Sequence, residues 1–306
     1  MPNKTIVISV VSTKGGVGKT TFVANLSGLL AALKLRVLVV DADPQASMTM
    51  YYPLEGEPRA TGLADVLYRG GHILAEDVAA TSIPGLSILA ANLKAPDNKS
   101  VPVENWLQTR LDGIFMLKNA MKGAYVQDNF DVVVIDSQGS TGTLTGLAAM
   151  AGDFMVASFR PDFLTHTAFY SDLMPLLESL NVLRKQSPEL GTGPVRVLLN
   201  DVPRTKNARM IAEALRGEFR PHANIHAHPD ISVLDTFVPR GAAYAEATTN
   251  QCPVHQFDRP SGGKLNSGFE VMHQVVYELM PHLKGVWADG ISPQGQATSE
   301  TQGLGE

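Results

Sequence analysis

A glycine-rich segment near the N-terminus has the residue types and the spacing of a phosphate-binding loop. Residues 12–21 read Ser-Thr-Lys-Gly-Gly-Val-Gly-Lys-Thr-Thr. Glycines let backbone N–H groups point at phosphate oxygens, which side chains would otherwise keep away. A helix predicted directly after the loop adds partial positive charge at its N-terminus. The predicted phosphate cradle comprises Gly15, Gly16, Val17, Gly18, Lys19, Thr20 and Thr21.

Two side chains of this loop have the chemistry to hold a nucleoside triphosphate and its metal ion. Lys19 is expected to reach the β- and γ-phosphates, and the Thr20 hydroxyl is expected to ligate Mg²⁺. The plain pattern G-x-x-x-x-G-K-S/T fails because residue 13 is Thr, whereas the variant K-G-G-x-G-K-S/T fits at every position. A turn that merely caps a helix is the alternative, and the flanking strand and helix argue against it.

The elements around the loop alternate between strands and helices, and the strands are apolar on both faces. This pattern predicts an α/β fold with a doubly wound, mostly parallel sheet and helices on both faces. The predicted strands are Thr5–Val11, Arg36–Val40, Leu86–Ala90, Val132–Ile135, Phe154–Phe159, Val195–Asn200 and Val233–Val238. The predicted helices are Thr20–Leu33, Thr165–Leu183, Ala208–Phe219 and Phe269–Leu283, with one more near Trp106–Met121 in the irregular stretch 91–128.

The composition excludes several classes of protein. The 306 residues include 25 Lys and Arg against 30 Asp and Glu, so nucleic-acid binding would need a local basic patch. The single cysteine, Cys252, excludes a disulfide framework, a four-cysteine zinc site and a cysteine-bound iron–sulfur cluster within one chain. It suits a reducing cytosol. No apolar run approaches the ~18 residues of a membrane-spanning helix, so no membrane partner is expected.

Four segments together resemble the ParA/MinD family of P-loop ATPases, which carry the deviant Walker A loop. Besides the loop itself, residues 39–45 read Val-Val-Asp-Ala-Asp-Pro-Gln and are similar to the ParA form of the second motif, D-x-D-P-Q. Residues 198–200, Leu-Leu-Asn, resemble the strand end whose Asn reads adenine. Residues 236–240, Thr-Phe-Val-Pro-Arg, resemble the segment beside the base. The resemblance covers roughly residues 4–284.

The resemblance implies roles for single side chains. Lys14 would reach across a dimer interface to the partner's nucleotide, as an arginine finger supplied in trans does elsewhere. Asp43 would position the attacking water and Asp41 would belong to the Mg²⁺ shell, with strand-end capping as the alternative for both. The residues implied to hold the adenine base are Asn200, Pro239 and Arg240.

A third carboxylate, Asp136, ends the apolar strand Val132–Ile135 and is the Walker B candidate. It would hold Mg²⁺ through a water molecule and completes the expected catalytic set of Lys14, Lys19, Asp43 and Asp136. The family usually continues with a small residue and two prolines, but residues 137–140 here read Ser-Gln-Gly-Ser. Gln138 is therefore either a polar loop residue without a role or a contact to the attacking water. The departure puts the hydrolysis rate in question more than nucleotide binding.

A basic stripe follows the strand that ends at Asn200. Positions 206, 209, 213, 216 and 220 recur at helical spacing, and all but Glu213 are basic. A solvated helix face is one explanation of this stripe. Because ParA-like ATPases bind nonspecific DNA as ATP dimers, the resemblance favours the other, a DNA-binding surface. The DNA-binding candidates are Lys206, Arg209, Arg216 and Arg220, with Arg259 and Lys264 from a later loop.

The sequence therefore predicts a ParA-type partitioning ATPase with slow basal turnover. Residues 1–287 are expected to form one ATPase domain, and the acidic, polar residues 288–306 are expected to be disordered. The expected partners are a second copy of the chain with ATP and Mg²⁺, nonspecific DNA and a ParB-like centromere-binding protein, at a nucleoid-associated cytoplasmic location. The tail lacks the basic amphipathic helix of the membrane-binding MinD branch.

Two alternatives remain open. One is a positioning scaffold for a protein cargo, such as secretion or flagellar machinery, with weak hydrolysis. The other is a P-loop metabolic enzyme, against which the D-x-D-P-Q motif argues. The cargo, the stimulating partner and the role of residues 91–128 are left undetermined.

Overall fold

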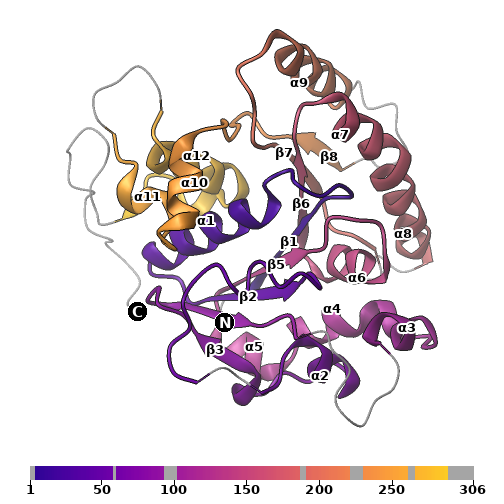
Figure 1. The fold of residues 1–306 in the computed structure, drawn as a ribbon. Coiled ribbons are helices and arrows are strands. Elements are labelled where there is room, and N and C mark those ends of the chain that lie inside the picture. The colour runs from indigo at the N-terminus through magenta and orange to yellow at the C-terminus, as the bar shows by residue number, and fades with distance from the viewer. Residues whose placement is uncertain are drawn as a thin grey trace.

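The computed structural model describes residues 4–57, 60–92, 102–186, 191–220, 230–260 and 266–288. The strands are β1 (Ile6–Val11), β2 (Val37–Ala42), β3 (Val78–Ala80), β4 (Leu86–Leu89), β5 (Val132–Ser137), β6 (Phe154–Phe159), β7 (Val195–Leu199) and β8 (Ile231–Val233). They form one eight-stranded sheet in the order β3-β4-β2-β5-β1-β6-β7-β8 (Figure 1). Every pair is parallel except β3 with β4. The predicted mostly parallel α/β sheet is confirmed.

Helices connect these strands and cover both faces of the sheet. They are α1 (Lys19–Ala32), α2 (Leu63–Tyr68), α3 (Val103–Gln108), α4 (Met116–Met121), α5 (Ala124–Asn129), α6 (Thr143–Ala151), α7 (Phe163–Ala168), α8 (Met174–Gln186), α9 (Lys206–Glu218), α10 (Ala242–Thr249), α11 (Val254–Phe257) and α12 (Gly268–Leu279). Figure 1 shows α1, α10, α11 and α12 grouped on one side of the sheet and α2–α6 with α8 on the other. None of these helices combines the length and the apolar character needed to cross a bilayer.

The alternation of side chains along the central strands explains why both faces are covered. Ile8 and Val10 pack with α1 and α12, whereas Val7 packs on the opposite face with α2, α4 and α6. Successive side chains of a strand point to opposite faces, so strands that are apolar throughout need a helix layer on each side. All six residues of β5 are buried, including Asp136 at its carboxyl end.

Several predicted boundaries were wrong. The last strand is Ile231–Val233 rather than Val233–Val238. Residues 234–238 run beside β7 and make only isolated backbone hydrogen bonds to it, so they do not form a strand ladder. The helix predicted near Trp106–Met121 is the two helices α3 and α4, joined by a turn. The helix predicted over Thr165–Leu183 is α7 and α8 with a π-helical turn, Phe169–Leu173, between them. Residues 289–306, most of the predicted tail, lie outside the described residues.

Candidate nucleotide site

The glycine-rich loop joins β1 to α1 in the conformation that a phosphate cradle needs. Gly16 and Gly18 have φ angles of 76° and 75°, in the left-handed region that glycine adopts without steric cost. Gly18 is the residue that precedes α1, so this turn also orients the N-terminus of the helix toward the loop. A Cβ atom at Gly18 would lie 3.0 Å from Asn200 Nδ2, so the position has little room for a side chain.

A buried ion pair connects the loop to the end of β5. Lys19 Nζ donates to Asp136 Oδ1 at 2.6 Å, and Thr20 Oγ1 donates to Asp136 Oδ2 at 2.8 Å. Burial raises the pKa of Asp136 above its ordinary value, whereas Lys19 and Thr20 act to lower it. The parallel pairing of β1 and β5 places the loop and this carboxylate at the same edge of the sheet. The three residues that were predicted to contact phosphate and Mg²⁺ therefore lie together.

Asp41, at the carboxyl end of β2, is a second buried carboxylate at this edge. It accepts hydrogen bonds from the Thr49 backbone and hydroxyl, both at 2.7 Å, and from Asp43 N at 3.1 Å. Burial, and next the charge of Asp136, raise the pKa of Asp41 to about 6. Two buried carboxylates and one lysine leave this cluster of side chains with excess negative charge, which favours a cation. Thr49 has no motif signal and was missed by sequence reasoning.

The two residues with implied roles at the rim lie in different environments. Asp43 is partly exposed, and its Oδ1 accepts from Gln45 N at 2.9 Å. Lys14 is also partly exposed, and its Nζ lies 3.5 Å from Asp162 Oδ1. Asp162 caps α7 by accepting from Thr165 N, which fixes the carboxylate beside the loop. The pairing of Lys14 with Asp162 had no signal in the sequence.

A cavity of about 310 Å³ lies beside Gly16 and Gly18 and contains the predicted base-side residues Asn200, Pro239 and Arg240 in its lining. Asn200 Nδ2 donates to the Val17 carbonyl at 2.9 Å and to Ser158 Oγ at 3.1 Å. These bonds fix the amide so that its Oδ1 is the atom left for a base. Arg240 forms a two-bond ion pair with Asp201, at 2.9 and 2.7 Å.

The unusual segment after Asp136 packs directly against the phosphate loop. A Cβ atom at Gly139 would lie 2.9 Å from Gly15 Cα, so only glycine permits this approach. Gln138 Nε2 donates to Glu104 Oε1 of α3 at 3.4 Å. Residues 91–128, which had no assigned role, thus supply a contact to the loop that follows the Walker B candidate.

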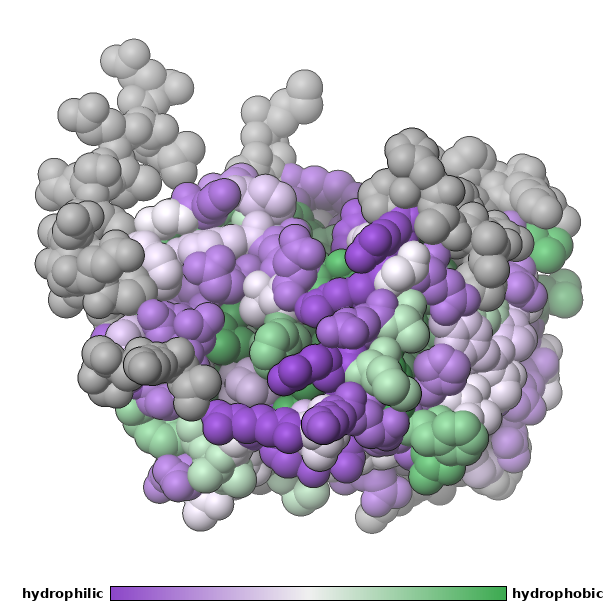
Figure 2. Space-filling model, turned by 90° about the horizontal axis from the view of Figure 1, so that it is seen from above, coloured by the Kyte–Doolittle hydropathy of each residue, from purple (hydrophilic) through white to green (hydrophobic). Residues whose placement is uncertain are grey.

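The candidate DNA-binding residues are only partly available for a ligand. Lys206, Arg209 and Arg220 are exposed on or next to α9, and Figure 2 shows that hydrophilic residues dominate the side on which α9 lies. Arg216 is half-buried and donates to the Asp235 carbonyl at 2.8 Å, so the predicted stripe is interrupted. Arg259 stacks over the Phe269 ring at 5.5 Å, and Lys264 lies outside the described residues.

Comparisons with known proteins place the chain in a family and match its fold. A family model described as "AAA domain" matches residues 5–187. The chain is 28% identical to the chromosome partitioning protein ParA of Caulobacter vibrioides over 84% of this chain and 89% of that protein. It is 30% identical to the cell division protein PomZ of Myxococcus xanthus over 88% of this chain and 76% of that one. The ATP complex of a McdA variant from Cyanothece superposes with a TM-score of 0.70, at 18% identity, over 90% of this chain and 97% of that chain.

Proposed function

Since the chain belongs to the ParA/MinD family of P-loop ATPases, we propose that it binds Mg²⁺–ATP and hydrolyses it slowly to drive DNA partitioning. The observation that carries the proposal is the convergence of Lys19 and Thr20 on Asp136. Lys19 would turn from the carboxylate to the β- and γ-phosphates when a nucleotide enters. That exchange keeps the lysine paired in both states.

The residues present fit Mg²⁺. Thr20 and Asp136 offer a hydroxyl and a carboxylate oxygen 2.8 Å apart, the oxygen donors that this hard cation prefers. Asp41 adds a second carboxylate. It lies close enough to Asp136 that the charge of Asp136 helps to raise the pKa of Asp41. Bound Mg²⁺ would neutralise charge on the phosphates, and Thr20, Asp41 and Asp136 are the residues that would hold it.

The base cavity supports a preference for adenine. Asn200 Nδ2 is engaged by Val17 and Ser158, so Oδ1 faces the ligand as an acceptor. Adenine presents an amino donor where guanine presents a carbonyl acceptor. Guanine would place two acceptors against each other, and we infer that ATP binds more tightly than GTP.

Dimerisation and DNA binding are the next parts of the proposal. Lys14 lies at the rim of the loop, where a second copy facing the site would be within its reach. An ATP-bound sandwich dimer would also double the number of α9 cations that face DNA. By the family resemblance, a ParB-like protein would stimulate hydrolysis and release the dimer from DNA. The cargo would be a plasmid, a chromosome or an integrated mobile element.

Calorimetry with the Lys19→Ala variant tests the nucleotide site. We expect ATP binding to be lost, because the loop would keep its backbone cradle but lose its charge on the phosphates. Lys34→Ala, at an exposed position after α1, is the matched control and should bind ATP as the parent chain does. Tight ATP binding by Lys19→Ala would overturn the assignment.

A second candidate function is a positioning scaffold for a protein cargo with weak hydrolysis. The engagement of Arg216 with Asp235 favours it, because fewer cations of the stripe remain for DNA. The relative PomZ, named as a cell division protein, also fits a role beyond DNA partitioning. ATP-dependent binding of nonspecific DNA would separate the two, since only the partitioning function requires it of this chain.

A further inference from the structure

The hydroxyl of Thr49 joins the ends of two neighbouring strands at the nucleotide edge of the sheet. Its Oγ1 donates to Asp41 Oδ2 at 2.7 Å and accepts from Ala91 N at 3.1 Å. Asp41 belongs to β2, and Ala91 follows β4, which pairs with β2. None of the roles proposed above for the nucleotide site uses this hydroxyl.

The partners of the Thr49 hydroxyl fix the direction of both hydrogen bonds. A backbone N–H can only donate, so Ala91 N occupies an acceptor position of Oγ1. The one hydrogen of the hydroxyl is then left for the carboxylate of Asp41. That side chain is fully buried, where a hydrogen bond to a charged group is stronger than it is in water.

The hydrogen bonds to Asp41 are distributed unequally between its two oxygens. Oδ2 accepts from both N and Oγ1 of Thr49, each at 2.7 Å. Among the described residues, Oδ1 accepts only from Asp43 N, at 3.1 Å. Because a carboxylate oxygen has about two acceptor positions, Thr49 fills those of Oδ2. Thr49 therefore determines that Oδ1 is the oxygen of Asp41 with an acceptor position left for a ligand.

The segment that carries Thr49 is anchored by the two tyrosines that follow it. Tyr51 Oη and Thr248 Oγ1 of α10 share a hydrogen bond at 2.9 Å, and Tyr52 Oη donates to the Ala24 carbonyl of α1 at 3.0 Å. Both tyrosines are buried in the core that includes α1. Thr49 is thus held in place before a ligand enters, which lowers the ordering cost of binding.

From this geometry we infer that Thr49 is a positioning residue for the Mg²⁺ of the nucleotide site, an inference that rests on the proposed binding of Mg²⁺–ATP. Thr49 acts through Asp41, because it holds Oδ2 and leaves Oδ1 for the Mg²⁺ shell. Hydrogen bonds that orient a ligating carboxylate typically change metal affinity by about 10- to 100-fold. A purely structural link between β2 and β4 is the alternative, but these strands already pair along Val37–Val40 and Leu86–Leu89.

The affinity of the full chain for a fluorescent ATP analogue, measured in Mg²⁺ and in EDTA, tests the inference. The ratio of the two affinities reports how strongly Mg²⁺ supports nucleotide binding. Thr49→Val keeps the shape of the side chain but removes the hydroxyl, and we expect it to lower this ratio at least about tenfold. The affinity in EDTA should be unchanged, because Lys19 and the glycine-rich loop remain. Thr49→Ser restores the hydroxyl and should restore the ratio.

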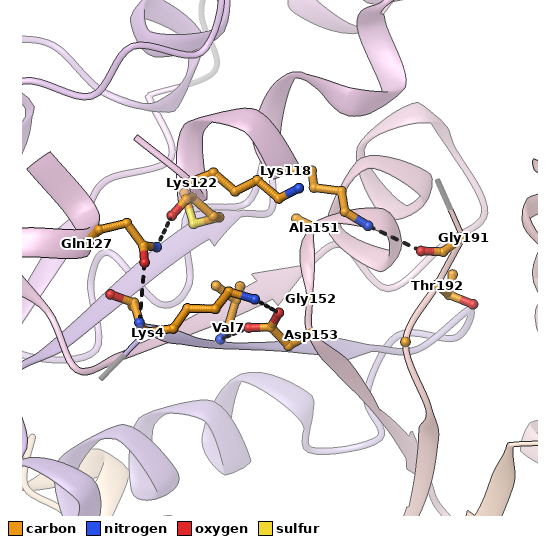
Figure 3. A pocket seen from close by; sticks show the side chains of 13 residues that line it. Lys4, Val7, Lys118, Lys122, Gln127, Ala151, Gly152, Asp153, Gly191 and Thr192 are labelled. Atoms are coloured by element: carbon orange, nitrogen blue, oxygen red, sulfur yellow. Dashed lines mark hydrogen bonds and ion pairs between the residues drawn. The ribbon is translucent and has the colours of Figure 1, made fainter. Parts of the chain in front are cut away.

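A matched control removes another threonine hydroxyl, at the opposite edge of the sheet. Thr5 is buried, and its Oγ1 donates to the Phe130 carbonyl at 2.7 Å. It lines a cavity of about 180 Å³ together with Lys4 and Asp153, where the amino ends of β1 and β6 meet (Figure 3). Thr5→Val should lower the free energy of unfolding, as Thr49→Val should, but it should leave the effect of Mg²⁺ unchanged.

Four results would overturn the inference. They are a parental ratio in Thr49→Val, a loss in Thr49→Ser as large as that in Thr49→Val, an equal loss in Thr5→Val, and a parent chain that binds the analogue equally well with and without Mg²⁺. If the parent chain binds no analogue in either condition, the proposed function itself fails. Normal binding by the parent chain together with a parental ratio in Thr49→Val defeats the role of Thr49 alone.

Discussion

At the scale of single residues, Lys14 differs from the buried charged groups of the candidate site. Lys19, Asp41 and Asp136 are buried and bonded to one another or to Thr20 and Thr49, whereas Lys14 is partly exposed beside Asp162. The ion pair between Lys14 and Asp162, at 3.5 Å between partly exposed groups, contributes little to the stability of the fold. The lysine is therefore held near the loop at little cost and remains able to leave it for a partner's nucleotide.

Lys14→Ala should separate ATP binding from assembly. We expect the variant to bind ATP with normal affinity but to stay monomeric, because the proposed contact of Lys14 is with the other subunit's nucleotide. Light scattering with ATP and Mg²⁺ measures this, and Asp43→Ala provides the opposite case, a dimer that persists because the attacking water is not positioned. Normal dimerisation of Lys14→Ala would show that the lysine does not act in trans.

Gln138 has two explanations that kinetics can distinguish. Its amide donates to Glu104 at 3.4 Å, which suits a loop contact, and we expect Gln138→Ala to slow single-turnover hydrolysis less than about tenfold, or 1.4 kcal/mol of barrier. Gln108→Ala, which removes an exposed glutamine of neighbouring α3, is the control. A hundredfold loss in the Gln138 variant alone would make Gln138 a catalytic residue.

At the scale of elements, α9 and the residues that directly follow it present cations of two kinds. Arg209 and Arg220 are exposed, whereas Arg216 bonds to the Asp235 carbonyl. We expect Arg209→Ala/Arg220→Ala to flatten the slope of log K against log salt for duplex DNA by up to roughly 3.6, at about 0.9 per phosphate contact and four contacts per dimer. Filter binding across salt concentrations measures the slope. Arg216→Ala should leave the slope unchanged. If neither variant changes the slope, α9 presents an ordinary solvated face.

The sequence predicted the elements whose signal is local. The loop at 12–18 and the apolar strands around it were found because glycine spacing and buried β-branched runs do not depend on distant contacts. The last strand was misplaced because Leu234 and Val238 are buried apolar residues, as strand residues are, yet each makes only a single backbone hydrogen bond to β7. The sequence pattern does not distinguish such isolated bonds from a strand ladder. Contacts such as Gln138 with Glu104 join residues far apart in the chain, so no spacing pattern could reveal them.

At the scale of the whole molecule, an ion pair joins the amino ends of two central strands. Arg36 precedes β2 and bonds to both oxygens of Asp131, which precedes β5, at 2.8 and 3.2 Å. Hydrogen bonding to Arg36 lowers the pKa of Asp131. A carboxyl group whose pKa is lowered in the folded state stabilises the fold at pH values above its ordinary pKa, near 4. This contribution is lost as the pH falls through the pKa of the folded state.

Asp131→Asn should therefore lower the free energy of unfolding at pH 7 by no more than about 1 kcal/mol, because both groups are partly exposed. The difference between the variant and the parent chain should shrink toward pH 3. Urea unfolding at both pH values measures it, and Asp112→Asn, at an exposed pair within one turn, is the control. A difference that grows on acidification would contradict the assigned sign.

The sheet ends in two strands of three residues each, β3 and β8, and the backbone of Glu55 already bonds to Ala80 of β3 at 2.9 Å. Short edges of this kind give an incoming strand few backbone groups to pair with. Copies of the chain therefore have poor means to polymerise by extending one another's sheets. If association is confined to the nucleotide face, it closes after two copies, and neighbouring dimers on a DNA molecule would not recruit one another. The binding of preformed dimers to DNA should then follow the isotherm of independent sites, without cooperativity between neighbouring dimers.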